Sequence, residues 1–106
     1  MKTIAEGSAH TIVTRFFNEQ NLPVVPSTAR WRLYDVTNSR VVTDWADFPI
    51  PLSPVVSTLI PASSHVIVRD DLTRQEHAFI VQADTGLDTQ ISAEEHYYVR
   101  NLSATR

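Results

Sequence analysis

Four histidines are the side chains of this sequence best suited to acid–base or metal chemistry, and their spacing argues against both roles. They are His10, His65, His77 and His96. None has a second histidine at the close spacing of a zinc site. The neighbours in Glu76–His77 and Glu95–His96 point to opposite faces of a strand, so neither pair can act as a catalytic dyad. We therefore expect surface or strand histidines and no metal site.

The carboxylates give no stronger indication of chemistry. Asp70 and Asp71 lie in a polar loop, but a calcium site needs about six oxygen ligands and no further acids stand close by. Asp44 and Asp47 flank Trp45, an arrangement that suggests a carboxylate pair beside a sugar-stacking ring. Without a segment that would form a cleft, we interpret both groups as ordinary polar positions.

Nucleophilic catalysis and phosphate binding are equally unsupported. The serines occur in PSTAR, NSRV, LSPV and ASSHV, none of which is the glycine-flanked turn that exposes a catalytic serine. Gly7 and Gly86 are isolated, so no glycine-rich loop can surround a phosphate. The sequence predicts a protein that is not an enzyme, with no catalytic, cofactor-binding or metal-binding residues.

Composition limits the partners. The chain has 106 residues, enough for one modest core, and a net charge of −3, which argues against binding nucleic acid or an anionic membrane. There is no cysteine and hence no disulfide. No apolar run is long enough for a secretion signal or a bilayer span, so we expect no membrane insertion.

Abundant Val, Ile and Thr favour β-structure, and no segment has helical periodicity. We expect about seven strands, in residues 9–17, 28–35, 41–45, 55–61, 65–70, 77–84 and 94–102. In the first of these strands, either Ile12 and Phe16 or Val13 and Phe17 face inward.

The proline-rich residues 46–54 should cross from one sheet to the other. We expect an N-terminal arm at 1–8, a β-sandwich domain at 9–102 and a tail at 103–106, with termini polar enough to reach a neighbour.

The clearest alternation, in residues 28–35, predicts one candidate surface. It places Ala29, Trp31 and Leu33 inward and leaves Arg30, Arg32 and Tyr34 outward. Arginine and tyrosine are enriched at protein interfaces, so the outward trio is a candidate interface. The alternative is an ordinary solvated sheet face.

The remaining aromatic residues allow a second hypothesis. Tyr97 and Tyr98 could form a flat platform on which a sugar ring stacks. In the alternative interpretation Trp31 and Trp45 fill the core, and one tyrosine of the pair also packs inward.

The order of segments from Phe16 onward carries a resemblance. TRFF is followed by LPVVPSTA, RWRLYDVTNSRVVTDW, VVSTLIPASSHVI, QEHAFIVQAD and HYYVRNL. This order resembles the small Ig-like or fibronectin type III-like domains encoded among tailed-bacteriophage virion genes, over about residues 9–102. Immunoglobulin domains proper carry a cysteine pair, so the likeness is to the fibronectin-type branch.

The resemblance implies an all-β Ig-like sandwich of about seven antiparallel strands and a structural role in the virion. Such a protein is made in the host cytoplasm and serves as a neck or tail accessory or a capsid decoration. Its partners would be other virion proteins and copies of itself. Two rival hypotheses are a carbohydrate-binding module for adsorption to the host surface and a small inhibitor of a host protein.

Overall fold

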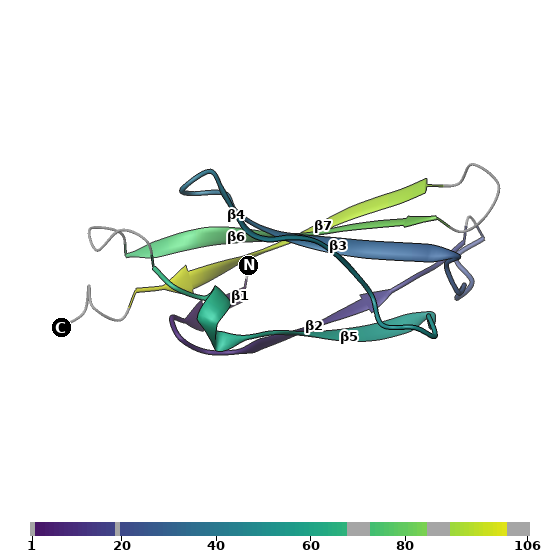
Figure 1. Cartoon of the computed structure of the whole chain (residues 1–106), viewed down its shortest axis with the longest axis horizontal. Helices are drawn as coiled ribbons and strands as arrows, with labels where there is room; N and C mark the ends of the chain where they lie inside the picture. The colour runs from purple at the N-terminus through teal and green to yellow at the C-terminus, as the bar shows by residue number, and fades with distance from the viewer. Residues whose placement is uncertain (1, 19, 68–72, 85–89, 102–106) are drawn as a thin grey trace.

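The computed structural model describes residues 2–18, 20–67, 73–84 and 90–101, and within them the chain is almost entirely β (Figure 1). Seven strands and one 3-10 turn are present in this part of the chain. The strands are β1 (Lys2–Ala5), β2 (His10–Arg15), β3 (Thr28–Asp35), β4 (Arg40–Asp47), β5 (Val55–Ile60), β6 (Arg74–Asp84) and β7 (Gln90–Arg100), and the turn η1 is Ala62–Ser64. The prediction of an all-β protein is confirmed.

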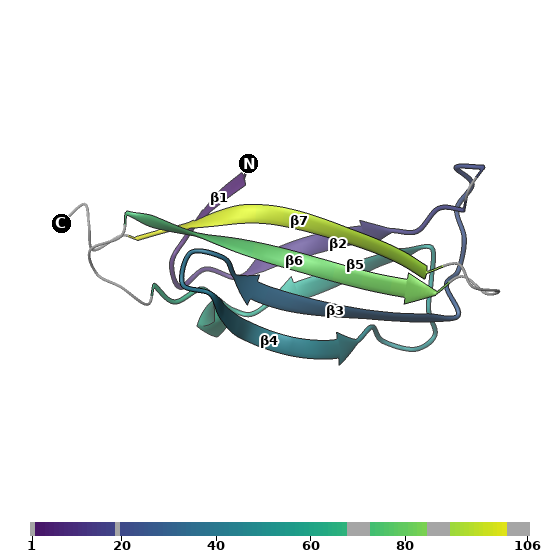
Figure 2. The same ribbon diagram turned by 90° about the horizontal axis from the view of Figure 1, so that it is seen from above.

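The strands form two sheets that face each other. One has five strands in the order β1-β7-β6-β3-β4, and the other is the pair β2-β5. Seen from above, the pair lies beneath the middle of the larger sheet, with β4 at one side and β1 and β7 at the other (Figure 2). The molecule is elongated, with extents of 51 × 23 × 21 Å. All strand pairs are antiparallel except β1 with β7, which is parallel.

The core lies between the sheets and is built by alternate residues of each strand. The alternation predicted for β3 is present, because Ala29 and Leu33 are buried, Trp31 packs against the core, and Arg30 between them is exposed. In β2 the inward residue is Ile12, followed by Phe16 just beyond the strand, whereas Val13 and Phe17 are exposed. This settles the face that the sequence left open. The buried apolar residues are Ile12, Phe16, Ala29, Leu33, Phe48, Ile60, Ala78, Phe79, Val81, Ala83, Tyr97 and Val99.

The predicted crossing segment and the predicted hairpin turn are both present. Residues 46–54 include the end of β4 and the connection to β5, so this proline-rich segment crosses between the sheets as predicted. The hairpin turn at Asn38 and Ser39 is also present, and Ser39 has a positive φ of 52°.

Two expectations about strands and termini differ from the structure. Residues 2–5 are not a free arm, because β1 pairs with β7 from Lys2↔Tyr97 to Ala5↔Arg100. Residues 65–67 are not a strand, since they follow the 3-10 turn and bring a buried His65 into the core. The tail at 103–106, Asp70 and Asp71, and the glycine turn at residue 86 lie outside the described residues.

Polar side chains fill one end of the core. The backbone carbonyl of Ser8 can only accept a hydrogen bond, so Nδ1 of buried His65 donates to it, at 2.6 Å. Nε2 of His65 must then accept from the Tyr97 hydroxyl, 2.7 Å away. This bond joins the loop after β5 to β7 across the interior.

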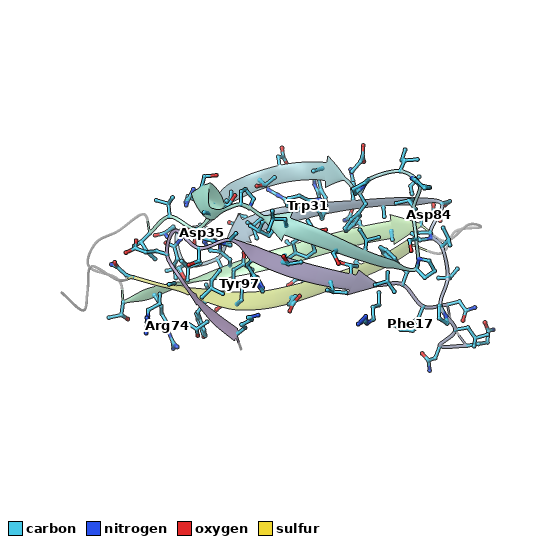
Figure 3. The ribbon with its side chains drawn as sticks, turned by 90° about the horizontal axis from the view of Figure 1, so that it is seen from below. Phe17, Trp31, Asp35, Arg74, Asp84 and Tyr97 are labelled. Atoms are coloured by element: carbon cyan, nitrogen blue, oxygen red, sulfur yellow. The ribbon has the colours of Figure 1, made fainter. Side chains whose placement is uncertain are left out.

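A second part of this polar end surrounds the β3–β4 turn. Asp35 is fully buried, and its carboxylate accepts hydrogen bonds from Asn38 Nδ2 at 2.8 Å and from Arg40 Nε at 3.1 Å. Asn38 Nδ2 also donates to Gln75 Oε1 at 3.0 Å. A buried carboxylate is costly without such partners, so these bonds fix the turn against β6. Figure 3 shows Asp35 and Tyr97 towards the same end of the sandwich.

The hydroxyl of Tyr97 gives a direct test of this polar end. Tyr97→Phe keeps the ring but leaves Nε2 of buried His65 without its donor, and an unsatisfied buried acceptor costs about 1–3 kcal/mol. We expect that loss in the free energy of unfolding, measured by urea denaturation. The matched control is Tyr98→Phe on the outward face, which should change stability by less than about 0.5 kcal/mol. Equal effects of the two substitutions would contradict the hydrogen-bond assignment.

Candidate interaction surface

The outward side of β3 carries the predicted trio Arg30, Arg32 and Tyr34. In β6 the residues opposite them are Gln82, Ile80 and Ala78. Because directly paired residues share a face of the sheet, these six residues lie on one outward face, on which Ala78 is only 3% exposed. The structure therefore brings the trio together on one face, as the alternation predicted.

Arg30 is held in place by two neighbouring strands. Its Nε and Nη2 donate to Oε1 of Gln82, at 3.2 and 2.7 Å. Its guanidinium also lies over the indole of Trp45 on β4, 4.5 Å from the ring centroid. These contacts orient the planar group along the sheet, in the geometry that favours stacking and paired hydrogen bonds with a carboxylate.

Arg32 adds a second cation to the same surface. Its guanidinium carbon is 5.7 Å from the centroid of Tyr34 and 5.9 Å from that of Trp45. Its Nε is 3.9 Å from a carboxylate oxygen of Asp44, which is beyond hydrogen-bond distance, and this Nε has no hydrogen-bond partner within the described residues. We call Arg30, Arg32, Tyr34 and Trp45 the arginine–aromatic layer.

The sequence analysis did not include Trp45 in the outward trio. It left Trp45 open between a sugar-stacking ring and a core position with Trp31. Of the two tryptophans only Trp31 points inward, where it stacks on Phe79 at 5.3 Å. The β3–β4 register shifts between Trp31 and Leu33 and again between Leu33 and Tyr34. Each shift moves β4 side chains to the other face, which strict alternation cannot anticipate. The only signal in the sequence was the acidic flanks of Trp45, since acidic residues favour a solvated position.

An open hollow of about 530 Å³ adjoins the layer at Arg30. Its lining comes from the adjacent ends of β3, β4 and β6 and consists of Thr28, Ala29, Arg30, Asp47, Gln82, Ala83 and Asp84. Asp47 and Asp84 give this end a negative charge beside the positive layer. A partner that covers both would meet charges of both signs.

The proposed sugar platform of Tyr97 and Tyr98 is not formed. Tyr97 is only 1% exposed, and its hydroxyl is bonded to His65 inside the core, so it cannot stack on an external ring. Tyr98 faces outward, but the guanidinium of Arg74 lies 4.0 Å from its ring centroid. Adjacent strand residues face opposite ways, which is the physical reason that the two rings never share a surface. In the alternative interpretation, the inward packing of one tyrosine is confirmed, whereas the core position of Trp45 is wrong.

The histidines are more buried than the sequence suggested. His65 and His77 are fully buried, and they lie with Tyr97 in a cluster of rings whose centroids are 5.5–5.8 Å apart. Gln75 Nε2 donates to His77 Nε2 at 2.8 Å, so the proton of the neutral ring is on Nδ1, which has no partner within the described residues. A buried imidazole is harder to protonate, and burial lowers the pKa of His77 to about 4.

The other two histidines lie nearer to solvent. Burial and the neighbouring charge of Lys2 lower the pKa of His10. His96 is different, because hydrogen bonds to Glu94 and Glu76 raise its pKa. Glu76 and His77 point to opposite faces of β6, as the sequence analysis expected, since His77 is buried and Glu76 bonds to His96. The sequence analysis missed this bond between Glu76 and His96, which lie on adjacent strands.

Comparisons of the chain with protein-family models, curated proteins and solved structures found no match. Within the described ranges no three or more histidine and acidic side chains are grouped so that they could hold a metal ion. In the same part of the chain no helix has the length and apolar character needed to cross a membrane.

Replacing each tryptophan by alanine tests which ring lies in the arginine–aromatic layer and which lies in the core. Trp45→Ala removes the ring beneath two partly exposed cations, and we expect the free energy of unfolding to fall by about 1–2 kcal/mol. Trp31→Ala opens the core beside Phe79 and should cost about 3 kcal/mol or more. Urea denaturation measures both, with Trp45→Phe as the control that keeps an aromatic surface. A loss for Trp45→Ala equal to that for Trp31→Ala would place Trp45 in the core instead.

The buried His77 predicts acid sensitivity. Between its ordinary pKa of 6.5 and its folded value of about 4, the unfolded chain binds a proton that the folded protein does not. The free energy of unfolding therefore falls as the pH is lowered through this window, by up to about 1.4 kcal/mol per pH unit. The pKa values of His65 and His10 are also lowered, so these residues likewise make the folded protein less stable as the pH falls. The pKa of His96 is raised, so its protonation favours the folded protein, and solvent screening makes this contribution small.

Proton NMR titration of the histidine rings checks this assignment residue by residue. The His77 resonances should titrate with a midpoint near 4, and those of His96 should titrate above the ordinary value of 6.5. In His77→Gln the loss of stability on acidification should be smaller. A His77 midpoint near its ordinary value would show that the ring is accessible to water.

Proposed function

We propose that this chain is a non-enzymatic structural protein of a tailed-bacteriophage particle and that it acts through protein–protein contacts. The order of segments from TRFF to HYYVRNL, which resembles small virion domains of such phages, is the reason for naming the particle. The arginine–aromatic layer is the observation that supports action by binding to another protein. Guanidinium groups held flat on aromatic rings are suited to a protein partner, because arginine, tryptophan and tyrosine supply most of the binding energy at interfaces.

The fold we propose is the Ig-like sandwich in its fibronectin-type form. In that fold the strands B and E share one sheet, while G, F, C and C′ are neighbours in the other. The pair β2-β5 and the order β7-β6-β3-β4 correspond to these two sets, and this agreement supports the proposal. Because one fold can serve many functions, the contact role is argued from the outward surface and not from the fold.

Within this proposal the outward surface of β3 and β4 contacts a neighbouring virion protein. The matching surface on the neighbour would carry carboxylates that pair with Arg30 and Arg32. It would also carry a basic or polar group near Asp47 and Asp84, which line the adjoining hollow. Complementary charge of this kind fixes the orientation of docking and rejects partners of the same charge.

Mass spectrometry of purified particles tests the location. The particles are those encoded by the genome that carries this gene, and the copy number is taken relative to the major capsid protein. Hundreds of copies would indicate a capsid decoration, and a few to a few dozen would indicate a neck or tail component. Absence from the particles would contradict the proposal and favour the alternative of a small inhibitor of a host protein.

Charge reversal tests the surface. The double variant Arg30→Glu/Arg32→Glu should reduce incorporation into particles by about tenfold or more, since two buried like-charge contacts each cost more than 1 kcal/mol. Arg100→Glu is the control, because Arg100 is exposed on β7. It lies opposite Arg74 in the backbone register of β6 and β7, away from the arginine–aromatic layer. Circular dichroism confirms that each variant is folded. Equal incorporation of the two variants would exclude the layer as the contact surface.

A further inference from the structure

One edge of the sandwich is only partly closed. β7 runs from Gln90 to Arg100, but β1 pairs with it only from Tyr97 onward, so no described strand lies beside residues 90–96 at this edge. β2 also has a single partner among the described strands, β5. Both free edges present backbone N–H and C=O groups that can pair with an added strand.

The two free edges border one groove. A hollow of about 180 Å³ is lined by Ile12, Val13, Thr14, Arg15, Phe79, Val81, Ala93, Glu94 and Glu95. A second of about 210 Å³ is lined by Thr14, Arg15, Phe16, Phe17, Val81, Ala83 and Ala93. They have Thr14, Arg15, Val81 and Ala93 in common, so they are neighbouring parts of one groove between β2 and β7. We call it the edge groove.

Apolar side chains of β6 form the floor of the edge groove. Val81 lines both hollows, Phe79 the first and Ala83 the second. These three side chains are buried members of the core, with at most 7% of their surface exposed. The exposed apolar surface at the edge groove comes from β2 and the residues after it, since Val13 lines the first hollow and Phe17 the second, and they are 48% and 45% exposed. Apolar surface of this kind gains free energy when a partner covers it, by about 25 cal/mol for each Å².

The charges at the edge groove set the chemistry of an occupant. Glu94 and Glu95 line only the hollow nearer β1, whereas Arg15 lines both hollows. An occupant therefore meets carboxylates at one end and a guanidinium where the two hollows adjoin. A complementary segment carries a basic residue at one end, apolar residues at alternate positions, and an acidic residue at the other end.

We propose that the edge groove binds an extended peptide segment of a partner protein by strand addition to residues 90–96 of β7. The added strand continues the position that β1 occupies, and its alternate apolar side chains point into the edge groove. Seven residues of β-strand span roughly 20 Å, which suits a short motif. Main-chain hydrogen bonds supply affinity in this mode, and the side-chain hollows supply specificity. The inference does not depend on the particle role, because it concerns a different surface.

The test uses the full chain and a synthetic acetylated and amidated peptide, KTVTVTE, labelled for fluorescence anisotropy. This peptide places lysine and glutamate at opposite ends and valine at alternate positions. We expect saturable binding, and at least about tenfold weaker binding when the central threonine is replaced by proline, which lacks the backbone donor. The uncharged peptide QTVTVTQ should also bind more weakly, because it cannot pair with Glu95 and Arg15.

Protein variants locate the site. Ala93→Arg places a large side chain where both hollows meet, and we expect it to weaken binding at least about tenfold without loss of stability, since Ala93 is exposed. Ser57→Arg is the matched control, because it adds the same side chain at an exposed position of β5. Hydrogen exchange should show new protection in residues 90–96 when peptide is bound.

Four results would overturn the inference. They are no saturable binding of KTVTVTE, equal binding of KTVTVTE and its proline form, binding unaffected by Ala93→Arg, and new protection in β2 instead of β7. Absence of the chain from virus particles would contradict the proposed function and leave this inference intact.

Discussion

The packing of the β2–β5 pair against the five-stranded sheet is the interaction on which the rest of the structure depends. Two strands alone are marginal in water, so this small sheet is stable only because its inward residues are buried against the larger one. Ile12 and Ile60 of the pair belong to the same buried apolar cluster as Phe79 and Val99 of the larger sheet. The hydrogen bond between His65 and Tyr97 adds a polar tie at one end. The core is thus apolar along its length and polar where the loop after β5 enters.

This packing leaves two parts of the larger sheet uncovered by the β2–β5 pair, the outward face of β3 and β4 and the edge at β7. On the outward face, β3 and β4 hold the arginine–aromatic layer, which is rigid because each cation already rests on a ring. At the edge, β1 is too short to cover β7, and the edge groove results. A rigid surface loses little conformational entropy on binding, and a free edge offers unpaired backbone groups. The proposals for these two regions therefore follow from how the core is closed.

The sequence predicted the features that depend on local alternation and failed where distant segments meet. The inward face of β3 and the outward trio could be predicted because the period of two is regular from Thr28 to Asp35. The place of Trp45 could not, because it depends on register shifts between β3 and β4. Residues 2–5 lacked a strong apolar pattern, and their strand exists only through pairing with the far end of the chain. The buried His65 likewise results from contacts with Ser8 and Tyr97 that no local pattern contains.

The central claim is that the outward surface of β3 and β4 contacts a neighbouring protein in a virus particle. A density map of the purified particles, into which this sandwich is fitted, tests the claim most directly. We predict density of an adjacent protein over Arg30, Arg32 and Trp45, with carboxylate side chains facing the two guanidinium groups. A sandwich found in the particle with this surface exposed to solvent would contradict the claim, even if the protein were present in many copies.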